Sequence, residues 1–196
     1  MSKPKLFLMC GISGSGKTTF ARRFAESFGL HYISPDDFYA LYNGDERKHK
    51  NEFEIWMSLF RALHMAEQDG ASVIFDTNAP TMVDRAQILN WFPDFEHHMI
   101  CITAPPELCK RNNKSRRRVI PDDVMEKMIQ DFQVPCECEW IPRASEWAYE
   151  KRWQSITILN NESNEGFKLT LRQYRGNIPP LTRIQLDHIN RLILEA

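Results

Sequence analysis

Eight consecutive residues near the N-terminus have the pattern of a phosphate-binding loop. The segment Gly11–Thr18 reads GISGSGKT and fits G-x-x-x-x-G-K-[ST] at every position. Glycines let the backbone curl so that its N–H groups point at phosphate oxygens, and a following helix adds the positive end of its dipole. The pattern predicts a nucleotide site formed by Gly11, Ile12, Ser13, Gly14, Ser15, Gly16, Lys17, Thr18 and Thr19.

Two side chains of this loop bring further chemistry. Lys17 can neutralise the β- and γ-phosphates and so act in catalysis, and the Thr18 hydroxyl can ligate Mg²⁺ directly. Magnesium is normally held by few protein atoms together with phosphates and water. The loop therefore predicts ATP and Mg²⁺ as cofactors.

Paired aspartates follow the next short apolar segment. Asp36 and Asp37 lie directly after His31–Ser34, in the sequence SPDDF. A carboxylate at the carboxyl edge of an α/β sheet faces the phosphate loop, where it can orient and deprotonate an incoming hydroxyl. Alternatively, either aspartate caps a helix that starts near Phe38. We assign the base role to Asp36 and a substrate contact to Asp37, with Asp37 as the alternative base.

A third acidic position ends another apolar run, in the sequence FDTNAP. Asp76 is expected at the sheet edge near the phosphates, where it can hold a magnesium ion through water or bind an acceptor group. Asn78 is expected to contact the substrate beside it. The alternative for Asp76 is an N-terminal cap of a helix at Thr81, and both interpretations remain open.

The most basic stretch of the chain is 110–118, which reads KRNNKSRRR. Charge runs are usually solvated surface. In an α/β phosphotransferase, however, this connection would arch over the phosphates, where guanidinium groups can clamp the transferring charge. We therefore predict an arginine lid in which Arg116 is catalytic, Arg111 contacts the nucleotide, and Arg117 and Arg118 contact the substrate.

The elements that must position these residues alternate along the chain. Short β-branched or aromatic runs predict strands at Lys5–Cys10, His31–Ser34, Ala71–Asp76, His98–Thr103 and Ser155–Leu159. Helical spacing predicts helices at Thr18–Phe28, Phe53–Gln68, Thr81–Trp91, Pro105–Arg117 and Pro121–Phe132. Such alternation predicts a three-layer α/β/α fold with a five-stranded parallel sheet and right-handed crossovers.

The last part of the chain has a different character. We predict a P-loop domain over 1–160 and a C-terminal extension over 161–196, whose amphipathic helix docks on the same domain. Four aromatic residues just before the fifth strand are expected in a helical stretch that packs on the sheet: Trp140, Trp147, Tyr149 and Trp153.

Composition limits the partners and the compartment. The chain has 196 residues with 25 Lys and Arg against 26 Asp and Glu, so no overall basic field attracts nucleic acid and any such contact must be local. The five cysteines have no C-x-x-C spacing, which favours reduced thiols and the cytoplasm. The apolar run before Gly11 is too short to span a membrane, so no membrane partner is expected.

Taken together, these motifs resemble the kinase domain of phage-type 5′-polynucleotide kinases, within the P-loop kinase group that includes zeta toxins and small-metabolite kinases. The likeness runs from about Lys5 to Leu159 and rests on GISGSGKTTFARRFA, PDDF, FDTNAP and KRNNKSRRRVIPDDVMEKM. It implies a P-loop kinase fold with an arginine-rich lid, and transfer of the γ-phosphate of ATP to a 5′-hydroxyl of nucleic acid.

The resemblance carries individual roles onto matching positions. It implies phosphate and metal contacts for Lys17 and Thr18, a general base at Asp36 and an acceptor contact at Asp76. Two positions depart from the phage pattern. Tyr39 stands where those enzymes have an arginine that holds the substrate phosphate, and an ungapped match puts serine at the lid arginine, which leaves Arg116, Arg117 or Arg118 to substitute.

Three functions follow from these features. The first is an ATP-dependent kinase of a polynucleotide 5′-hydroxyl. The second is a kinase of a small metabolite such as a sugar acid, nucleoside or nucleotide sugar, which the near-neutral net charge of −1 favours. The third is a non-catalytic nucleotide-binding switch, for which the acidic motif at Asp36 would be unnecessary. The sequence predicts no oligomeric state.

Overall fold

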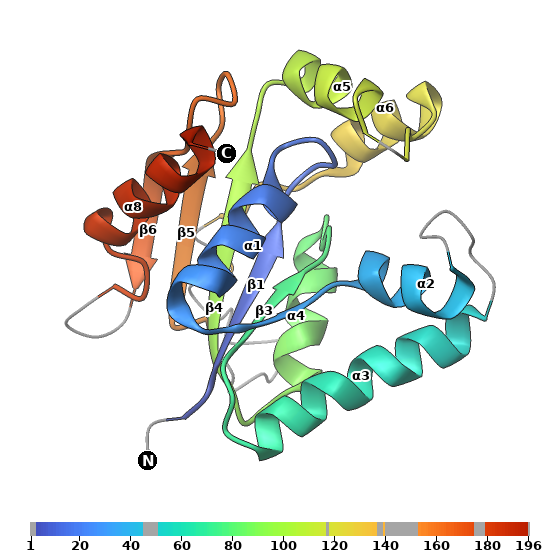
Figure 1. Ribbon diagram of the computed structural model, residues 1–196, viewed down its shortest axis with the longest axis vertical. Coiled ribbons are helices and arrows are strands. Elements are labelled where there is room, and N and C mark those ends of the chain that lie inside the picture. Colours follow the sequence, from blue (N-terminus) through green and yellow to red (C-terminus); the bar gives the residue numbers. More distant parts are fainter. Residues whose placement is uncertain are drawn as a thin grey trace.

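One six-stranded sheet forms the centre of the protein (Figure 1). The computed structural model describes residues 3–44, 51–116, 118–136, 139, 153–174 and 179–195. The strands lie in the order β2-β3-β1-β4-β5-β6, and all neighbours are parallel except β5 and β6. Their bounds are β1 Lys5–Cys10, β2 His31–Ile33, β3 Val73–Asp76, β4 Glu96–Thr103, β5 Ser155–Asn160 and β6 Lys168–Tyr174.

Helices cover both faces of this sheet, which gives the predicted α/β P-loop kinase fold. Buried residues of α3 and α4 pack on one face, and buried residues of α1 and α8 pack on the other. The helix bounds are α1 Lys17–Phe28, α2 Pro35–Asn43, α3 Glu52–Gln68, α4 Met82–Trp91, α5 Pro106–Lys114, α6 Asp122–Asp131 and α8 Arg183–Leu194.

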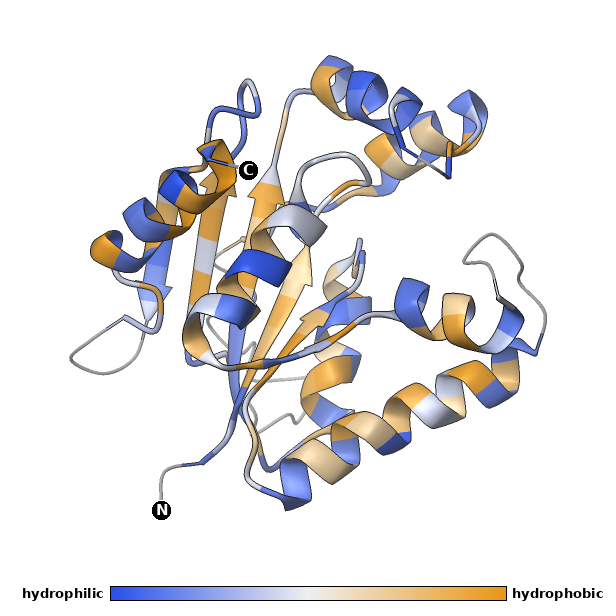
Figure 2. Ribbon diagram, viewed as in Figure 1, coloured by the Kyte–Doolittle hydropathy of each residue, from blue (hydrophilic) through white to orange (hydrophobic). Residues whose placement is uncertain are grey.

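The central strands are apolar on both faces because both faces are covered. In β1, Leu6 and Leu8 belong to the cluster under α3 and α4, while Phe7 and Met9 belong to the cluster under α1 and α8. Figure 2 shows the same contrast, with apolar central strands and helices that are apolar on only part of their surface. A strand buried on both sides reads as a continuous apolar run, which is why β1 could be recognised in the sequence.

The sixth strand corrects the predicted count of five. β6 runs antiparallel to β5, with a register shift at Ile158/Leu159, and none of its side chains is buried. Its sequence KLTLRQY therefore lacks the apolar run that identified the other strands. The edge position removes the need for apolar side chains on two faces, so a search for buried strands misses it.

The carboxyl ends of the parallel strands bring the predicted motifs to one edge of the sheet. Met9 pairs in register with Asp76, so β3 ends beside the start of the phosphate loop. The Gly11 amide donates to the Asn78 carbonyl across 3.3 Å, which ties that loop to the turn after β3. On the other side, Thr103 of β4 pairs with Asn160 of β5.

Several other predictions can be compared with the described residues. Of the stretch expected to be helical before β5, only Trp153 lies within them, where it is buried but not helical. Cys10, Cys101 and Cys109 are buried free thiols, whereas Cys136 is disulfide-bonded, contrary to the expectation of thiols throughout. Over the described part of the chain, every helix is too short or too polar to cross a membrane.

Candidate active site

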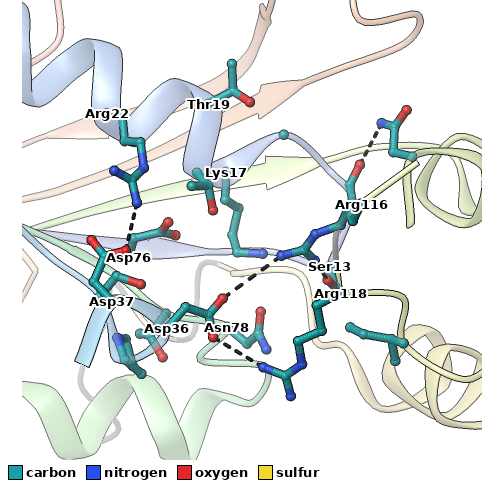
Figure 3. A pocket seen from close by; sticks show the side chains of 18 of the residues that line it. Ser13, Lys17, Thr19, Arg22, Asp36, Asp37, Asp76, Asn78, Arg116 and Arg118 are labelled. Atoms are coloured by element: carbon teal, nitrogen blue, oxygen red, sulfur yellow. Dashed lines mark hydrogen bonds and ion pairs between the residues drawn. The ribbon is translucent and has the colours of Figure 1, made fainter. Parts of the chain in front are cut away.

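A cavity of about 740 Å³ lies at the carboxyl edge of the sheet, between the phosphate loop, α2 and the α5–α6 connection (Figure 3). Most of the predicted site residues line it: Ser13, Gly14, Gly16, Lys17, Thr18, Thr19, Asp36, Asp37, Tyr39, Asp76, Asn78, Arg116 and Arg118. Among the predicted residues that the structure describes, those outside this lining are Gly11, Ile12, Ser15 and Arg111. Arg117 lies outside the described residues.

The phosphate loop has a backbone that only glycine adopts easily. Gly11, Gly14 and Gly16 have φ angles of 144°, 83° and 100°. A Cβ on Gly14 would lie 2.4 Å from the Cys109 carbonyl oxygen, because the loop packs directly on α5. The curled backbone ends at Gly16, where α1 begins, so the helix N-terminus faces the cavity.

Replacing Gly14 by alanine is expected to weaken nucleotide binding about tenfold or more. The new Cβ meets a backbone oxygen that cannot move away cheaply, and the positive φ adds about 1–2 kcal/mol of strain. Gly70→Ala is the matched control, because Gly70 has a φ of 70° but open space around a Cβ. Calorimetric titration with ATP checks this. Equal affinity losses in both variants would show that loop packing is not the cause.

Lys17 is buried at the inner end of the loop. Its Nζ donates to the Ile12 carbonyl across 3.1 Å. Burial lowers the pKa of Lys17; the nearby Asp76 carboxylate opposes this effect and Arg116 adds to it. Ser15 Oγ is buried and has no hydrogen-bond partner among the described residues. A phosphate chain fits this loop, because it would supply both the negative charge and the acceptor oxygens that these groups lack.

Thr18 and Asp76, the two residues predicted to hold Mg²⁺, both line the cavity. Thr18 is exposed in the cavity wall, and Asp76 is buried, with its Oδ2 accepting from the Tyr32 hydroxyl at 2.8 Å. The interpretation of Asp76 as a helix cap is wrong. Thr81 caps α4 itself, in a capping box with Asp84.

Tyr32 belongs to the cavity although sequence reasoning did not select it. Burial, and then the charge of Asp76, raises the pKa of its phenol well above the usual range. The Arg22 guanidinium lies 4.5 Å from the Tyr32 ring centroid and pairs with Asp37 at 2.8 Å. A chain of contacts therefore runs from Asp37 through Arg22 and Tyr32 to Asp76. No motif signals Tyr32, because its partner lies 44 positions away.

Tyr32→Phe is expected to lower turnover about five- to tenfold and to raise the Mg²⁺ concentration needed for half-maximal activity. The substitution keeps the ring but removes a hydrogen bond to a carboxylate, worth about 1.5–3 kcal/mol. Turnover measured over a Mg²⁺ series checks this. Tyr42→Phe is the control, since its hydroxyl bonds to Ser58 at an exposed position outside the cavity lining. An unchanged Mg²⁺ dependence would contradict a role in orienting Asp76.

The two adjacent aspartates have different surroundings. α2 begins at Pro35 with Ser34 at its N-cap, so both aspartates lie in the first turn and the capping interpretation is wrong. Asp37 is paired with Arg22. Asp36 instead faces the lid: its Oδ1 lies 3.5 Å from Arg118 Nη1, and its Oδ2 lies 4.0 Å from Arg116 Nη2 (Figure 3).

The α5–α6 connection presents these arginines to the cavity. Asn113 is buried and closes the connection, because its side chain donates to the Ile120 carbonyl at 2.8 Å and accepts from the Ile120 amide at 3.0 Å. Arg116 also donates to Ser13 Oγ of the phosphate loop. The basic run is thus more than solvated surface at Arg116 and Arg118, whereas Arg111 is exposed on α5 away from the cavity lining.

The cavity wall is partly aromatic and apolar. Its lining includes Tyr39, Trp56, Ile120 and Met128, together with Glu52. Tyr39 is buried, and its hydroxyl lies 3.5 Å from Glu52 Oε1. Tyr39 therefore stands in the wall at the position where the phage pattern has an arginine.

Solved structures share this architecture. The chain matches a sugar kinase from Janibacter sp. HTCC2649 with a TM-score of 0.54 and 18% identity, over 80% of this chain and 85% of that one. It matches a kinase-like protein from Chloroflexus aurantiacus with a TM-score of 0.55 and 19% identity, over 82% and 89%. It also matches a chain of the Pnkp1/Rnl/Hen1 RNA repair complex with a TM-score of 0.60 and 22% identity. This match covers 67% of this chain but only 44% of that one. At such identities the likeness shows the fold alone.

The sequence comparisons identify the family. No curated protein matches the chain significantly. The family model AAA_33, described as an AAA domain, matches residues 6–135, which is more than half of the chain and includes the phosphate loop, both acidic motifs and the lid. The chain therefore belongs to the AAA_33 family and has a P-loop kinase fold.

Proposed function

We propose that this kinase transfers the γ-phosphate of ATP to the 5′-hydroxyl of a polynucleotide. One observation carries the transfer step of this proposal: Asp36 lies 3.5 Å from Arg118 and 4.0 Å from Arg116 in the cavity that the phosphate loop also lines. A base and two guanidinium groups therefore meet where an acceptor hydroxyl would approach a bound triphosphate.

Each group has a distinct task in this transfer. The loop N–H groups and Lys17 hold the phosphate chain of ATP, which is the phosphoryl donor. Thr18 and Asp76 would hold Mg²⁺, which when bound would supply positive charge against the phosphate oxygens. Arg116 and Arg118 stabilise the charge that spreads over the transferring group. Asp36 orients the acceptor hydroxyl and accepts its proton as the new oxygen–phosphorus bond forms and the bond to the leaving ADP oxygen breaks.

The cavity lining favours a substrate with a flat ring. Trp56 and Tyr39 offer aromatic surface to the cavity, and Ile120 and Met128 add apolar surface. A terminal nucleobase can stack on such side chains, at about 1–3 kcal/mol per base. The fold likeness to a chain of an RNA repair complex is compatible with this acceptor, and the likeness to a sugar kinase is compatible with the alternative.

A small-metabolite kinase is the second candidate, and the cavity's carboxylates favour it. Asp36, Asp37, Glu52 and Asp76 all line the cavity. Carboxylates accept hydrogen bonds from the hydroxyls of a polyol and repel the phosphodiesters of a nucleic acid. A sugar acid or nucleoside would use the same loop, base and lid.

An acceptor panel separates these functions. ADP release in the presence of Mg²⁺ is measured with 5′-hydroxyl RNA and DNA oligonucleotides, nucleosides, sugar acids and nucleotide sugars, each compared by kcat/KM. We expect the oligonucleotides to rank first. A higher kcat/KM for a metabolite would replace the polynucleotide by that acceptor. ATP binding with no acceptor-dependent ADP release across the panel would favour the nucleotide-binding switch.

A further inference from the structure

Three asparagines meet against the phosphate loop, and all three also line the cavity. Asn112 comes from α5, whereas Asn161 and Asn164 come from the connection between β5 and β6. Asn112 Nδ2 donates to the Gly14 carbonyl at 2.8 Å, and Asn161 Nδ2 donates to the Ser15 carbonyl at 2.9 Å. The two amides thus bind two consecutive carbonyl groups of the loop.

Asn164 joins the other two into one cluster, the asparagine triad Asn112, Asn161 and Asn164. Its Oδ1 accepts from Asn112 at 3.1 Å and from Asn161 at 3.0 Å, and its Nδ2 donates to Asn112 Oδ1 at 2.8 Å. The backbone N–H of Asn164 donates to Asn161 Oδ1 at 2.8 Å. The backbone of Asn164 has a positive φ of 65°, a conformation that asparagine tolerates better than most residues.

The triad is also anchored to the sheet. Asn161 is buried, and its backbone N–H donates to the Thr103 carbonyl of β4 at 2.9 Å. Asn112 stands on the same helix that leads into the lid. The triad therefore connects three parts of the molecule: the sheet edge, the phosphate loop and the base of the lid.

Peptide geometry gives these contacts a consequence for the ligand. In a trans peptide, the carbonyl oxygen and the following N–H point in opposite directions. The Ser15 N–H already donates to the Ile12 carbonyl at 3.1 Å and so closes a turn within the loop, whereas holding the Ser15 carbonyl on Asn161 leaves the Gly16 N–H pointing away from Asn161 as a donor for a phosphate oxygen. A preorganised donor needs no reorientation when an anion binds.

We infer that the asparagine triad is a positioning device that fixes the Gly14–Gly16 turn of the loop and so holds the Gly16 N–H ready for a phosphate chain. The inference rests on the part of the proposed function in which the loop binds ATP, and it is independent of the acceptor. The ligand class is a linear polyphosphate, whether alone or in a nucleotide. Asn112 and Asn161 bind carbonyl groups of the loop backbone, so the triad acts on the phosphate chain through the loop.

Binding of inorganic tripolyphosphate tests the inference without requiring turnover. We expect Asn161→Ala and Asn112→Ala each to weaken tripolyphosphate about tenfold in calorimetric titration, with an unchanged KM for the acceptor. Hydrogen exchange at the Ser15 amide, which donates to the Ile12 carbonyl, should be faster in both variants because the loop turn loosens. Asn90→Ala is the control, since Asn90 also donates to a backbone carbonyl, that of Ala86 in α4, far from the loop.

Two results would overturn the inference. One is wild-type tripolyphosphate affinity in folded Asn112→Ala, whose partly exposed side chain can be removed even if Asn161→Ala does not fold. The other is an equal loss of affinity in Asn90→Ala. The wild-type protein could label no oligonucleotide while the triad variants still bind tripolyphosphate more weakly than the wild type. In that case the proposed acceptor is wrong and the inference stands.

Discussion

Replacing Lys17 by methionine is expected to lower turnover about a thousandfold or more, and to weaken ATP binding. The Nζ group is the buried cation of the phosphate loop and sits close to Asp76, where the β- and γ-phosphates would lie. Charge stabilisation of the transferring group is the main catalytic term in phosphoryl transfer. Losing one preorganised donor costs about a hundredfold to a thousandfold in turnover, and Lys17 also contributes to binding.

The same variant is expected to fold at least as stably as the wild type. Burial lowers the pKa of Lys17, which means that its charged form is less favourable in the folded protein than in water, although Asp76 offsets part of this cost. Methionine fills a similar volume without that charge, so a thermal melt without ligand should show an equal or higher melting temperature. Lys17→Ala should lose turnover equally. A Lys17→Met protein with more than a tenth of wild-type turnover would contradict the assignment.

Asp36→Asn is expected to lower turnover about a hundredfold to ten-thousandfold while ATP affinity stays near the wild-type value. Asparagine keeps the shape of the side chain but cannot accept the proton of the acceptor hydroxyl. General-base catalysis contributes about a hundredfold to ten-thousandfold to turnover. The side chain faces the lid arginines rather than the phosphate loop, so its charge matters for transfer more than for nucleotide binding. Pre-steady-state transfer and calorimetric ATP binding separate the two effects.

Asp37→Asn is the matched control for this prediction. Its carboxylate is already bound by Arg22. Both side chains are about half exposed, so this ion pair contributes little to the stability of the protein. We expect a decrease of less than tenfold in turnover. If Asp37→Asn has the larger effect, the base role belongs to Asp37, and if neither variant changes turnover, no carboxylate of α2 acts as a base.

The parts of the site that could be predicted from sequence are local. The phosphate loop is a contiguous motif, and a continuous apolar run with a glycine after it predicts both the buried strand β1 and the turn that follows. Asp36 and Asp76 could be placed because the carboxyl ends of parallel strands share one edge of the sheet. The predicted bounds of the five strands agree with the structure to within about two residues, because burial on both faces of the sheet sets the length of each apolar run.

The parts that could not be predicted depend on contacts between distant positions. Tyr32 reaches Asp76 across 44 positions, and Asn161 reaches Ser15 across 146, without any local pattern. The lid arginines were recognisable as a group. The direction of each arginine side chain, however, depends on how Asn113 closes the connection at Ile120. β6 was missed because an edge strand with no buried side chain carries little periodic signal.

The most direct test of the central claim is transfer of labelled γ-phosphate from ATP, with Mg²⁺, to an oligonucleotide that carries a 5′-hydroxyl, followed by mapping of the labelled end. The same oligonucleotide with a 5′-phosphate serves as the blocked control. We predict label at the 5′ end of the first oligonucleotide only, and its loss in Asp36→Asn. No label on the 5′-hydroxyl oligonucleotide, or undiminished labelling by Asp36→Asn, would contradict a polynucleotide 5′-hydroxyl kinase that uses this cavity.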